Sequence, residues 1–305
     1  MLELTDMFPD EETATRWIEK VIWSDGRVCP HCGSKHTREA ARSSVLPYYC
    51  NDCRKQFSVK VGTAMHNSRI SLRKWVFAIY FEMTNLKGVS SMKLHRDIGV
   101  SQKTAWFMLH RIREAWSEDL TDVFASEIEI DETYVGGKRK NMHAAKRREL
   151  TGRGTVGKTI VVGAKDRETN QITAKVVPST DAATLQGFAK DVTSPEATIY
   201  TDEARAYIGL GQERTHKMVN HSVGKYVEDM ASTNGLESFW SMLKRGYHGV
   251  YHHISAKHLG RYVAEYAGRH NFRQKNTIDQ MEEVIARMVG KQLMYKDLIT
   301  EKVEV

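Results

Sequence analysis

The chain has 305 residues, of which 41% are hydrophobic and 27% charged, and its formal net charge is +7 at pH 7. This is the composition of a folded globular protein with room for two or three domains, and no apolar run approaches the roughly 18 residues of a membrane span. The acidic N-terminus lacks the basic segment of a secretory signal, so we expect a cytoplasmic protein with no membrane partner. Basic residues are concentrated in 27–113, which favours a polyanionic partner.

All four cysteines occur in two C-x-x-C pairs, Cys29 with Cys32 and Cys50 with Cys53, and seventeen residues separate the pairs. This spacing is typical of a four-cysteine zinc site, whereas disulfides are disfavoured in the cytoplasm. We therefore predict a small zinc ribbon whose structural Zn²⁺ supplies folding free energy rather than chemistry. Residues 11–22 have apolar side chains at helical spacing and predict a helix that packs on a neighbouring module.

The next segment predicts three helices, over 72–83, from Ser90 onward and over 102–115. A short turn at 99–101 separates the last two, which is the pattern of a helix-turn-helix that places its second helix in the major groove of DNA. The alternative is an ordinary three-helix bundle that binds nothing. The candidates for DNA contact are Gln102, Lys103 and Thr104 at bases or phosphates, and Arg111 and Arg113 at phosphates.

Three acidic residues stand at the ends or starts of predicted elements farther along the chain. In 127–131, isoleucines alternate with acids, which predicts a strand with one acidic side that includes Asp131. Carboxylates beside a sheet core are costly unless they are paired or bind a cation. Asp202 ends a second apolar run, and Glu237 lies near the start of a helix. Three such carboxylates suit a magnesium site, and two ions there would support phosphoryl chemistry.

Glu237 also has a purely structural interpretation. Asn234 and Glu237 have the spacing of an N-cap and its N3 residue, so the glutamate could serve only to satisfy backbone donors. However, Trp240 and Lys244 share a helix face with Glu237. Lys244 and Arg245 form a basic end at which a substrate phosphate could lie, and this favours a functional role for Glu237.

The remaining elements follow a mixed α/β order. Strands are predicted over 159–164, 172–177 and 197–202 and near 216–221, and helices over 182–192, 255–271 and 278–288. A segment dense in Lys and Arg follows the first acidic strand, and it predicts either a mobile loop on a phosphate backbone or a solvated surface hairpin. Its candidates for DNA contact are Lys138, Arg139 and Lys140.

These motifs together resemble those of a known family. The four-cysteine ribbon, the helix-turn-helix, I-D-E-T-Y-V-G-G-K, Y-T-D and N-G-L-E-S-F-W-S-M-L-K-R-G look like those of bacterial insertion-sequence transposases of the aspartate–aspartate–glutamate type, in the ISXO-like branch with an N-terminal zinc ribbon. The resemblance covers roughly residues 10–275. It implies that Asp131, Asp202 and Glu237 bind two Mg²⁺ or Mn²⁺ ions, with Asn234 as the alternative third ligand, and that Lys244 contacts the transposon-end DNA.

The resemblance also implies an activity and a domain plan. The expected reaction is hydrolysis at the ends of an insertion sequence and joining of the freed 3′-hydroxyl to target DNA, with terminal inverted repeats and target DNA as partners of a homo-oligomer. The expected fold is multidomain: an N-terminal helix and zinc ribbon over 1–66, a helix-turn-helix domain over 67–120, a mixed α/β ribonuclease-H-like catalytic domain over 121–275 and a helical tail over 276–305. A DNA-binding regulator derived from such an enzyme and a structure-specific nuclease on the same fold remain alternatives.

Overall fold

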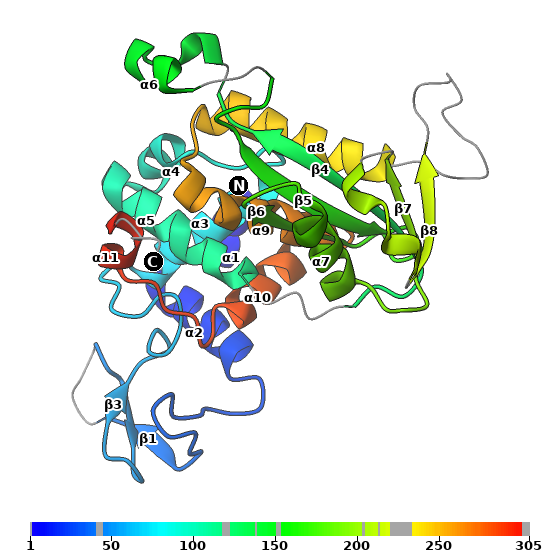
Figure 1. Cartoon of the computed structure of the whole chain (residues 1–305). Coiled ribbons are helices and arrows are strands. Elements are labelled where there is room, and N and C mark those ends of the chain that lie inside the picture. Colours follow the sequence, from blue (N-terminus) through cyan, green and yellow to red (C-terminus); the bar gives the residue numbers. More distant parts are fainter. Residues whose placement is uncertain are drawn as a thin grey trace. The chain divides into compact units, whose positions relative to one another are not determined.

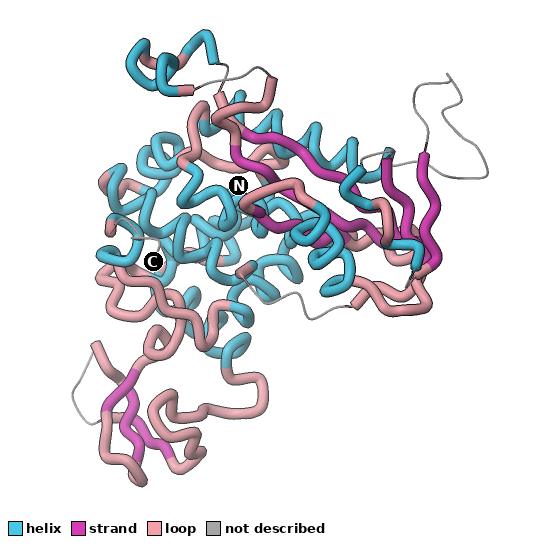
Figure 2. Tube along the Cα trace, in the orientation of Figure 1, coloured by secondary structure: helices cyan, strands magenta, loops and turns pink. Residues whose placement is uncertain are grey.

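The computed structural model describes residues 2–40, 45–117, 123–137, 139–150, 154–202, 205–212, 214–219 and 234–300 (Figure 1). The chain divides into two compact units: the helical unit, Met1–Ser117 with Lys275–Val305, and the sheet unit, Glu118–Gln274. Helices make up most of the helical unit outside a small three-stranded ribbon, whereas the long strands belong to the sheet unit (Figure 2). Within these described ranges, no helix is both long and apolar enough to cross a membrane.

The helical unit contains every helix that the sequence predicted for it. Its elements are α1 (Leu2–Met7), α2 (Glu11–Ile22), α3 (Leu72–Thr84), α4 (Ser91–Ile98), α5 (Gln102–Arg113), the 3-10 turn η1 (Glu114–Trp116), α10 (Thr277–Arg287) and α11 (Tyr295–Ile299). The short helices α1 and α11 were not predicted. Helix α10 contacts α2 and α3, and the compact unit of the N-terminal residues includes Lys275–Val305, which contains the helical tail expected over 276–305.

Serine side chains start the three helices α3, α4 and α5. Ser71, Ser90 and Ser101 are the N-caps, and each side chain accepts the backbone N–H of the residue three positions later. Helix α4 ends at Gly99, whose φ of 62° is the left-handed conformation that glycine adopts without strain. The turn between α4 and α5 is therefore fixed at both ends by local chemistry.

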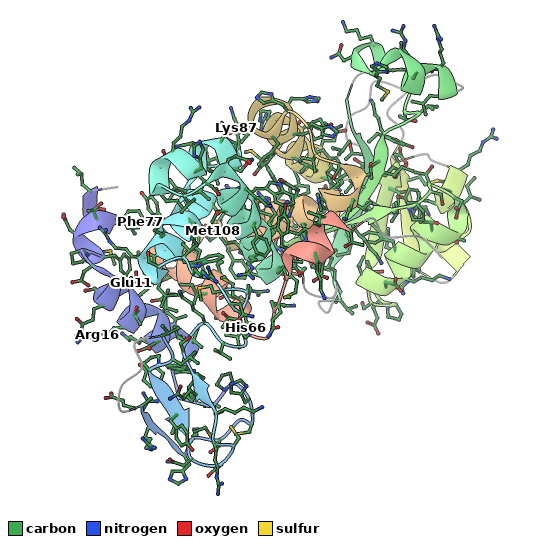
Figure 3. All side chains as sticks on the ribbon, turned by 90° about the vertical axis from the view of Figure 1, so that its left-hand side faces the viewer. Glu11, Arg16, His66, Phe77, Lys87 and Met108 are labelled. Carbon is green, nitrogen blue, oxygen red and sulfur yellow. The ribbon has the colours of Figure 1, made fainter. Side chains whose placement is uncertain are left out.

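Glu11 joins α2 to α3 within the helical unit (labelled in Figure 3). Its two carboxylate oxygens accept the backbone N–H groups of Leu72, at 2.6 Å, and Arg73, at 2.9 Å. These donors belong to the first turn of α3, where no carbonyl of the helix itself can reach them. One side chain therefore ties the two helices together.

The zinc ribbon is a three-stranded antiparallel sheet of β1 (Thr37–Glu39), β2 (Tyr48–Cys50) and β3 (Gln56–Phe57), in that order. Its core is small: Phe57 packs with Cys29 and Cys50, and Trp23 and Tyr48 lie against them. A core of this size needs support from a metal or a neighbouring module.

The sheet unit is built on a five-stranded mixed sheet. Its strands are β4 (Glu127–Val135), β5 (Thr159–Asp166), β6 (Ile172–Val177), β7 (Thr198–Asp202) and β8 (Thr215–Val219), in the spatial order β6-β5-β4-β7-β8. Strand β4 pairs antiparallel with β5 and parallel with β7. All five strands were predicted, although residues 220–221 of the last prediction lie outside the described residues. The basic segment between β4 and β5 contains the 3-10 turn η2 (Arg139–Asn141) and helix α6 (Ala144–Glu149), which were not predicted.

Helices cover both faces of this sheet (Figure 1). On one face lie α7 (Ala182–Val192) and the 3-10 turns η3 (Arg205–Tyr207) and η4 (Leu210–Gln212); on the other lie α8 (Asn234–Gly246), the π-helix η6 (Tyr247–Tyr251) and α9 (Ala256–Phe272). Ile128 and Ile130 belong to the core on the α7 face. Because successive residues of a strand point to opposite faces, the acidic side of β4 lies toward α8.

Candidate active site

Asp131 and Asp202 stand at the same level on neighbouring parallel strands. The register of β4 and β7 pairs Glu129 with Tyr200, and each aspartate lies two residues beyond its member of that pair. Asp202 is the last residue of β7. Two carboxylates from distant parts of the sequence are therefore brought to neighbouring positions on two inner strands of the sheet.

Glu237 is close enough to Asp131 for their charges to interact. Burial raises the pKa of Asp131 to about 6, and the negative charges of Asp202 and Glu237 add to this rise, whereas a hydrogen bond from Trp240 opposes it. Glu237 itself is exposed in the first turn of α8. Asp202 and Glu237 thus both lie near enough to Asp131 for their charges to act on it. The side chain of Asn234, the alternative ligand, lies outside the described residues.

Asp131 is held by a residue to which the sequence assigned no role in the site. The indole Nε1 of Trp240 donates a hydrogen bond to Oδ2 of Asp131 at 2.9 Å. Directly across the β4–β5 ladder, the partner of Asp131 is Gly163. The sequence placed Trp240 on the same helix face as Glu237, and that spacing was the available signal.

Glu129 is a second residue that sequence reasoning missed. Its side chain is buried, and its Oε1 pairs with Arg167 Nε at 3.0 Å. Its Oε2 accepts the backbone N–H groups of Gly235, at 3.0 Å, and Leu236, at 3.3 Å. This carboxylate therefore satisfies the start of α8, the role that the capping-box interpretation would have given to Glu237.

Glu132 adds a fourth carboxylate on the other face of β4. Tyr207 donates its hydroxyl to Glu132 Oε2 at 3.0 Å. Burial raises the pKa of Glu132 to about 7, the Tyr207 hydrogen bond opposes this, and the charges of Asp202 and Asp131 raise it further. Its Tyr207 partner belongs to the core on the α7 face, so Glu132 lies on the side of β4 opposite α8.

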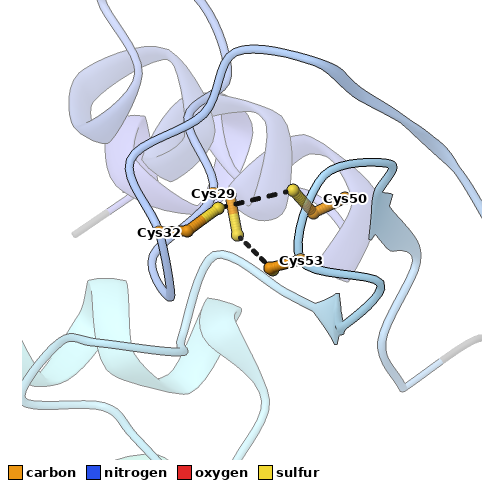
Figure 4. Close-up of side chains that lie close together, drawn as sticks. All are labelled: Cys29, Cys32, Cys50 and Cys53. Atoms are coloured by element: carbon orange, nitrogen blue, oxygen red, sulfur yellow. Dashed lines mark hydrogen bonds between the residues drawn. The ribbon is translucent and has the colours of Figure 1, made fainter.

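The four cysteines form a compact cluster in the ribbon (Figure 4). Cys29 Sγ lies 3.6 Å from Cys53 Sγ, and Cys32 Sγ lies 3.6 Å from Cys50 Sγ. Tetrahedral zinc with bonds of about 2.3 Å requires sulfur separations of about 3.8 Å, so the cluster fits this ion. Backbone N–H groups, chiefly that of Cys53, lower the pKa of the Cys50 thiol to about 7 and favour its thiolate, whereas burial raises the pKa of the Cys29 and Cys53 thiols.

This cluster differs in spacing from the acidic site. Among the described residues, the cysteines are the one group of three or more candidate ligands whose ligand atoms all lie within 4.8 Å of one another. The carboxylates of Asp131, Asp202 and Glu237 do not meet that spacing. They nevertheless supply three hard oxygen donors whose mutual repulsion a divalent cation would relieve, and in this respect they fit Mg²⁺ or Mn²⁺.

Two of the predicted phosphate contacts on α5 are at odds with the structure. Arg111 is 7% exposed, and its Nε donates to the carbonyl oxygen of Leu293 at 3.3 Å. Burial lowers the pKa of Arg111, although an arginine remains charged. Arg113 is 1% exposed. Because both side chains are buried within the helical unit, we withdraw them as DNA contacts.

The N-terminal end of α5 is more accessible. Gln102 and Lys103 are exposed, and Thr104 is partly buried. Gln102 Nε2 donates to Ser91 Oγ at 2.8 Å, and Lys103 Nζ lies 4.5 Å from the centre of the Tyr295 ring. Gln102 and Lys103 could contact DNA only if they gave up these contacts within the protein.

The predicted DNA contacts in the sheet unit fall into two groups. Lys244 and Arg245 are exposed in the last turn of α8, and Lys140 is exposed as well. The guanidinium of Arg139 donates to the backbone oxygens of Arg147 and Leu150 and is thus used to hold its own loop. Lys138 lies outside the described residues.

Comparison with known proteins agrees with this architecture. Residues 123–271 match the model of the ISXO2-like transposase domain, and residues 9–56 match that of the transposase zinc-ribbon domain. An "Uncharacterized transposase-like protein" of Haemophilus influenzae is 32% identical over 97 residues, which are 32% of this chain and 77% of that protein. The chain belongs to the ISXO2-like transposase family.

A longer relative extends the likeness over most of the chain. It is an "Uncharacterized protein in transposable element ISH50" of Halobacterium salinarum, 29% identical over 251 residues, which are 78% of this chain and 83% of the relative. The transposase match includes Asp131, Asp202 and Glu237, and the zinc-ribbon match includes all four cysteines. The mixed sheet with helices on both faces is consistent with a ribonuclease-H-like domain in this family.

Proposed function

We propose that this chain is a DNA transposase that cuts the ends of an insertion sequence and joins the freed 3′-hydroxyl groups to target DNA. The observation that carries the proposal is the placement of Asp131 and Asp202 at one level on neighbouring strands, with Glu237 near enough to raise the pKa of Asp131. Membership of the transposase family supports the same conclusion.

The acids would act as ligands of Mg²⁺ or Mn²⁺. When bound, two such ions activate an attacking oxygen and stabilise a leaving oxygen in phosphodiester chemistry. Asp131, Asp202 and Glu237 would hold them, and Trp240 would orient Asp131 through its N–H. Glu129 would keep the start of α8 against β4, so that Glu237 stays beside the two aspartates.

The helical unit would recognise DNA. Helices α4 and α5 and the turn at Gly99 have the order of a helix-turn-helix, and the exposed side chains at the start of α5 are Gln102 and Lys103. We propose that they, with the zinc ribbon, bind the terminal inverted repeats as part of a homo-oligomer that holds both ends. In the sheet unit, Lys140, Lys244 and Arg245 would contact phosphates.

The decisive experiment is a cleavage and joining assay on linear DNA that carries the repeats flanking the gene. The wild-type protein should cut these ends and join them to target DNA with Mg²⁺ or Mn²⁺, and Asp131→Asn should reduce both steps to background because a ligand charge is lost. Asp191→Asn, at an exposed position of α7, is the matched control and should retain both steps.

The same assay separates the alternatives. A structure-specific nuclease would cut without joining, and a DNA-binding regulator would bind the repeats without metal-dependent cleavage. Full activity of the Asp131→Asn variant would show that the assignment of the site is wrong.

A further inference from the structure

The geometry points to Trp240 as a positioning residue for the proposed metal centre: its indole N–H fixes the Asp131 carboxylate, and Gly163 provides the space that its ring occupies. This inference rests on the proposed role of Asp131 as a metal ligand and deepens it. Trp240 would touch neither cation nor DNA, and it would act through the aspartate alone.

The hydrogen bond between the two side chains has little freedom to change. Trp240 is 4% exposed and packs in the core shared by α8, α9 and one face of the sheet, with its ring centre 5.1 Å from that of Phe239. Its N–H is a donor only and points to Asp131 Oδ2 at 2.9 Å. A carboxylate offers about four lone-pair positions, so one indole bond orients it and leaves the others for a cation.

Gly163 makes this arrangement sterically accessible. A Cβ atom built at position 163 would lie 2.7 and 2.9 Å from two ring carbons of Trp240 and 3.3 Å from a methyl carbon of Leu236. The two ring contacts are closer than non-bonded carbons approach, so any side chain at this position would displace the indole. Gly163 lies directly across the ladder from Asp131. A displaced indole would therefore lose or weaken its hydrogen bond to the Asp131 carboxylate.

Helix α8 consequently serves the site twice. Glu237, in its first turn, contributes a carboxylate, and Trp240, three residues later, orients a carboxylate on another element. A movement of this helix would therefore alter two of the three ligands together. Because Trp240 orients Asp131, loss of its N–H should weaken cation binding even though all three ligand residues are still present.

Mn²⁺ binding to the full, zinc-loaded chain without DNA tests the inference, with free Mn²⁺ measured by electron paramagnetic resonance. Trp240→Phe keeps most of the ring and removes the N–H, and we expect its Mn²⁺ affinity to fall about tenfold, as for loss of one hydrogen bond to a charged group. In the cleavage assay, the Mn²⁺ concentration for half-maximal rate should rise by the same factor, whereas the rate at saturating Mn²⁺ should change much less.

Two further variants control for packing. Trp17→Phe removes an equivalent indole bond, 3.2 Å from Trp17 Nε1 to Glu282 Oε1 in the helical unit, and should leave Mn²⁺ affinity unchanged. Gly163→Ala should lower Mn²⁺ affinity as Trp240→Phe does, with circular dichroism and the melting temperature used to verify that the variant is folded.

The possible results distinguish this inference from the proposed function. If Asp131→Asn weakens Mn²⁺ binding but Trp240→Phe binds as the wild type does, Trp240 only packs and the inference is overturned. If Asp131→Asn also binds as the wild type does, the proposed metal site itself is wrong.

Discussion

Glu129 Oε2 accepts the backbone N–H of Gly235 at 3.0 Å, although 106 positions separate the two residues in the chain. The same carboxylate pairs with Arg167 through its other oxygen. Its strand carries Asp131 and the helix that it caps carries Glu237. One buried side chain thus links the two elements that supply ligands to the proposed site.

Glu129→Gln should destabilise the sheet unit. The change removes the buried negative charge that pairs with the guanidinium of Arg167, and breaking such a buried pair costs about 3 kcal/mol. Chemical denaturation followed by circular dichroism measures the free energy of unfolding. Glu127→Gln is the matched control, because the Glu127 side chain is 51% exposed and 3.4 Å from the same arginine, and its loss should cost less than about 1 kcal/mol. Equal costs for the two variants would contradict this account of Glu129.

Zinc content should depend on the four cysteines alone. We expect one Zn²⁺ per chain by elemental analysis, and Cys32→Ser should lose it together with the fold of the ribbon, because the ribbon core is small. His31→Ala and His36→Ala are the controls and should keep the metal. Loss of zinc from either histidine variant would show that the ligand set is different.

The sheet unit should lose stability between pH 6.5 and pH 4 through His270. Burial lowers the pKa of His270 to about 4 from its ordinary value of 6.5, and the positive charges of Arg273 and Lys165 act in the same direction, whereas a bond to the Asn170 carbonyl opposes them. The unfolded chain therefore binds more protons than the folded chain in this range. The contribution of His270 to the free energy of unfolding is fully present above pH 6.5 and is lost as the pH drops toward 4.

Calorimetry at pH 7 and pH 5 measures this contribution. The fall in melting temperature should be smaller for His270→Gln, which cannot titrate, than for the wild type. His248→Gln, at an exposed histidine, should show the wild-type fall. An unchanged fall in the His270 variant would assign the pH dependence to other groups.

Lys244→Ala and Arg245→Ala should weaken binding of DNA of any sequence to a similar degree. Each side chain is exposed at the end of α8, and each lost phosphate contact should lower the slope of log affinity against log salt by about 1. Fluorescence anisotropy with repeat and non-repeat duplexes at several salt concentrations measures both quantities. Lys175→Ala, at an exposed position of β6, is the control, and an equal effect there would mean that only general charge is being sensed.

Local sequence patterns predicted the elements, and they failed where distant segments meet. The alternation of Ile128 and Ile130 with acids correctly indicated the two faces of β4. The pairing of Asp131 with Gly163 depends on strand register, and the contact of Trp240 with Asp131 depends on how α8 docks, and neither is a local property. Arg111 was expected to contact phosphates, but it is buried and donates to the carbonyl of Leu293, 182 positions farther along the chain.

The helical unit is discontinuous in the chain, whereas residues 118–274 form the sheet unit without interruption. During synthesis on a ribosome, the sheet unit has its complete sequence available while α10, a packing partner of α2 and α3, is still to be made. Domains generally fold as their residues emerge. The helical unit would therefore finish folding after the sheet unit, although most of its residues are translated first.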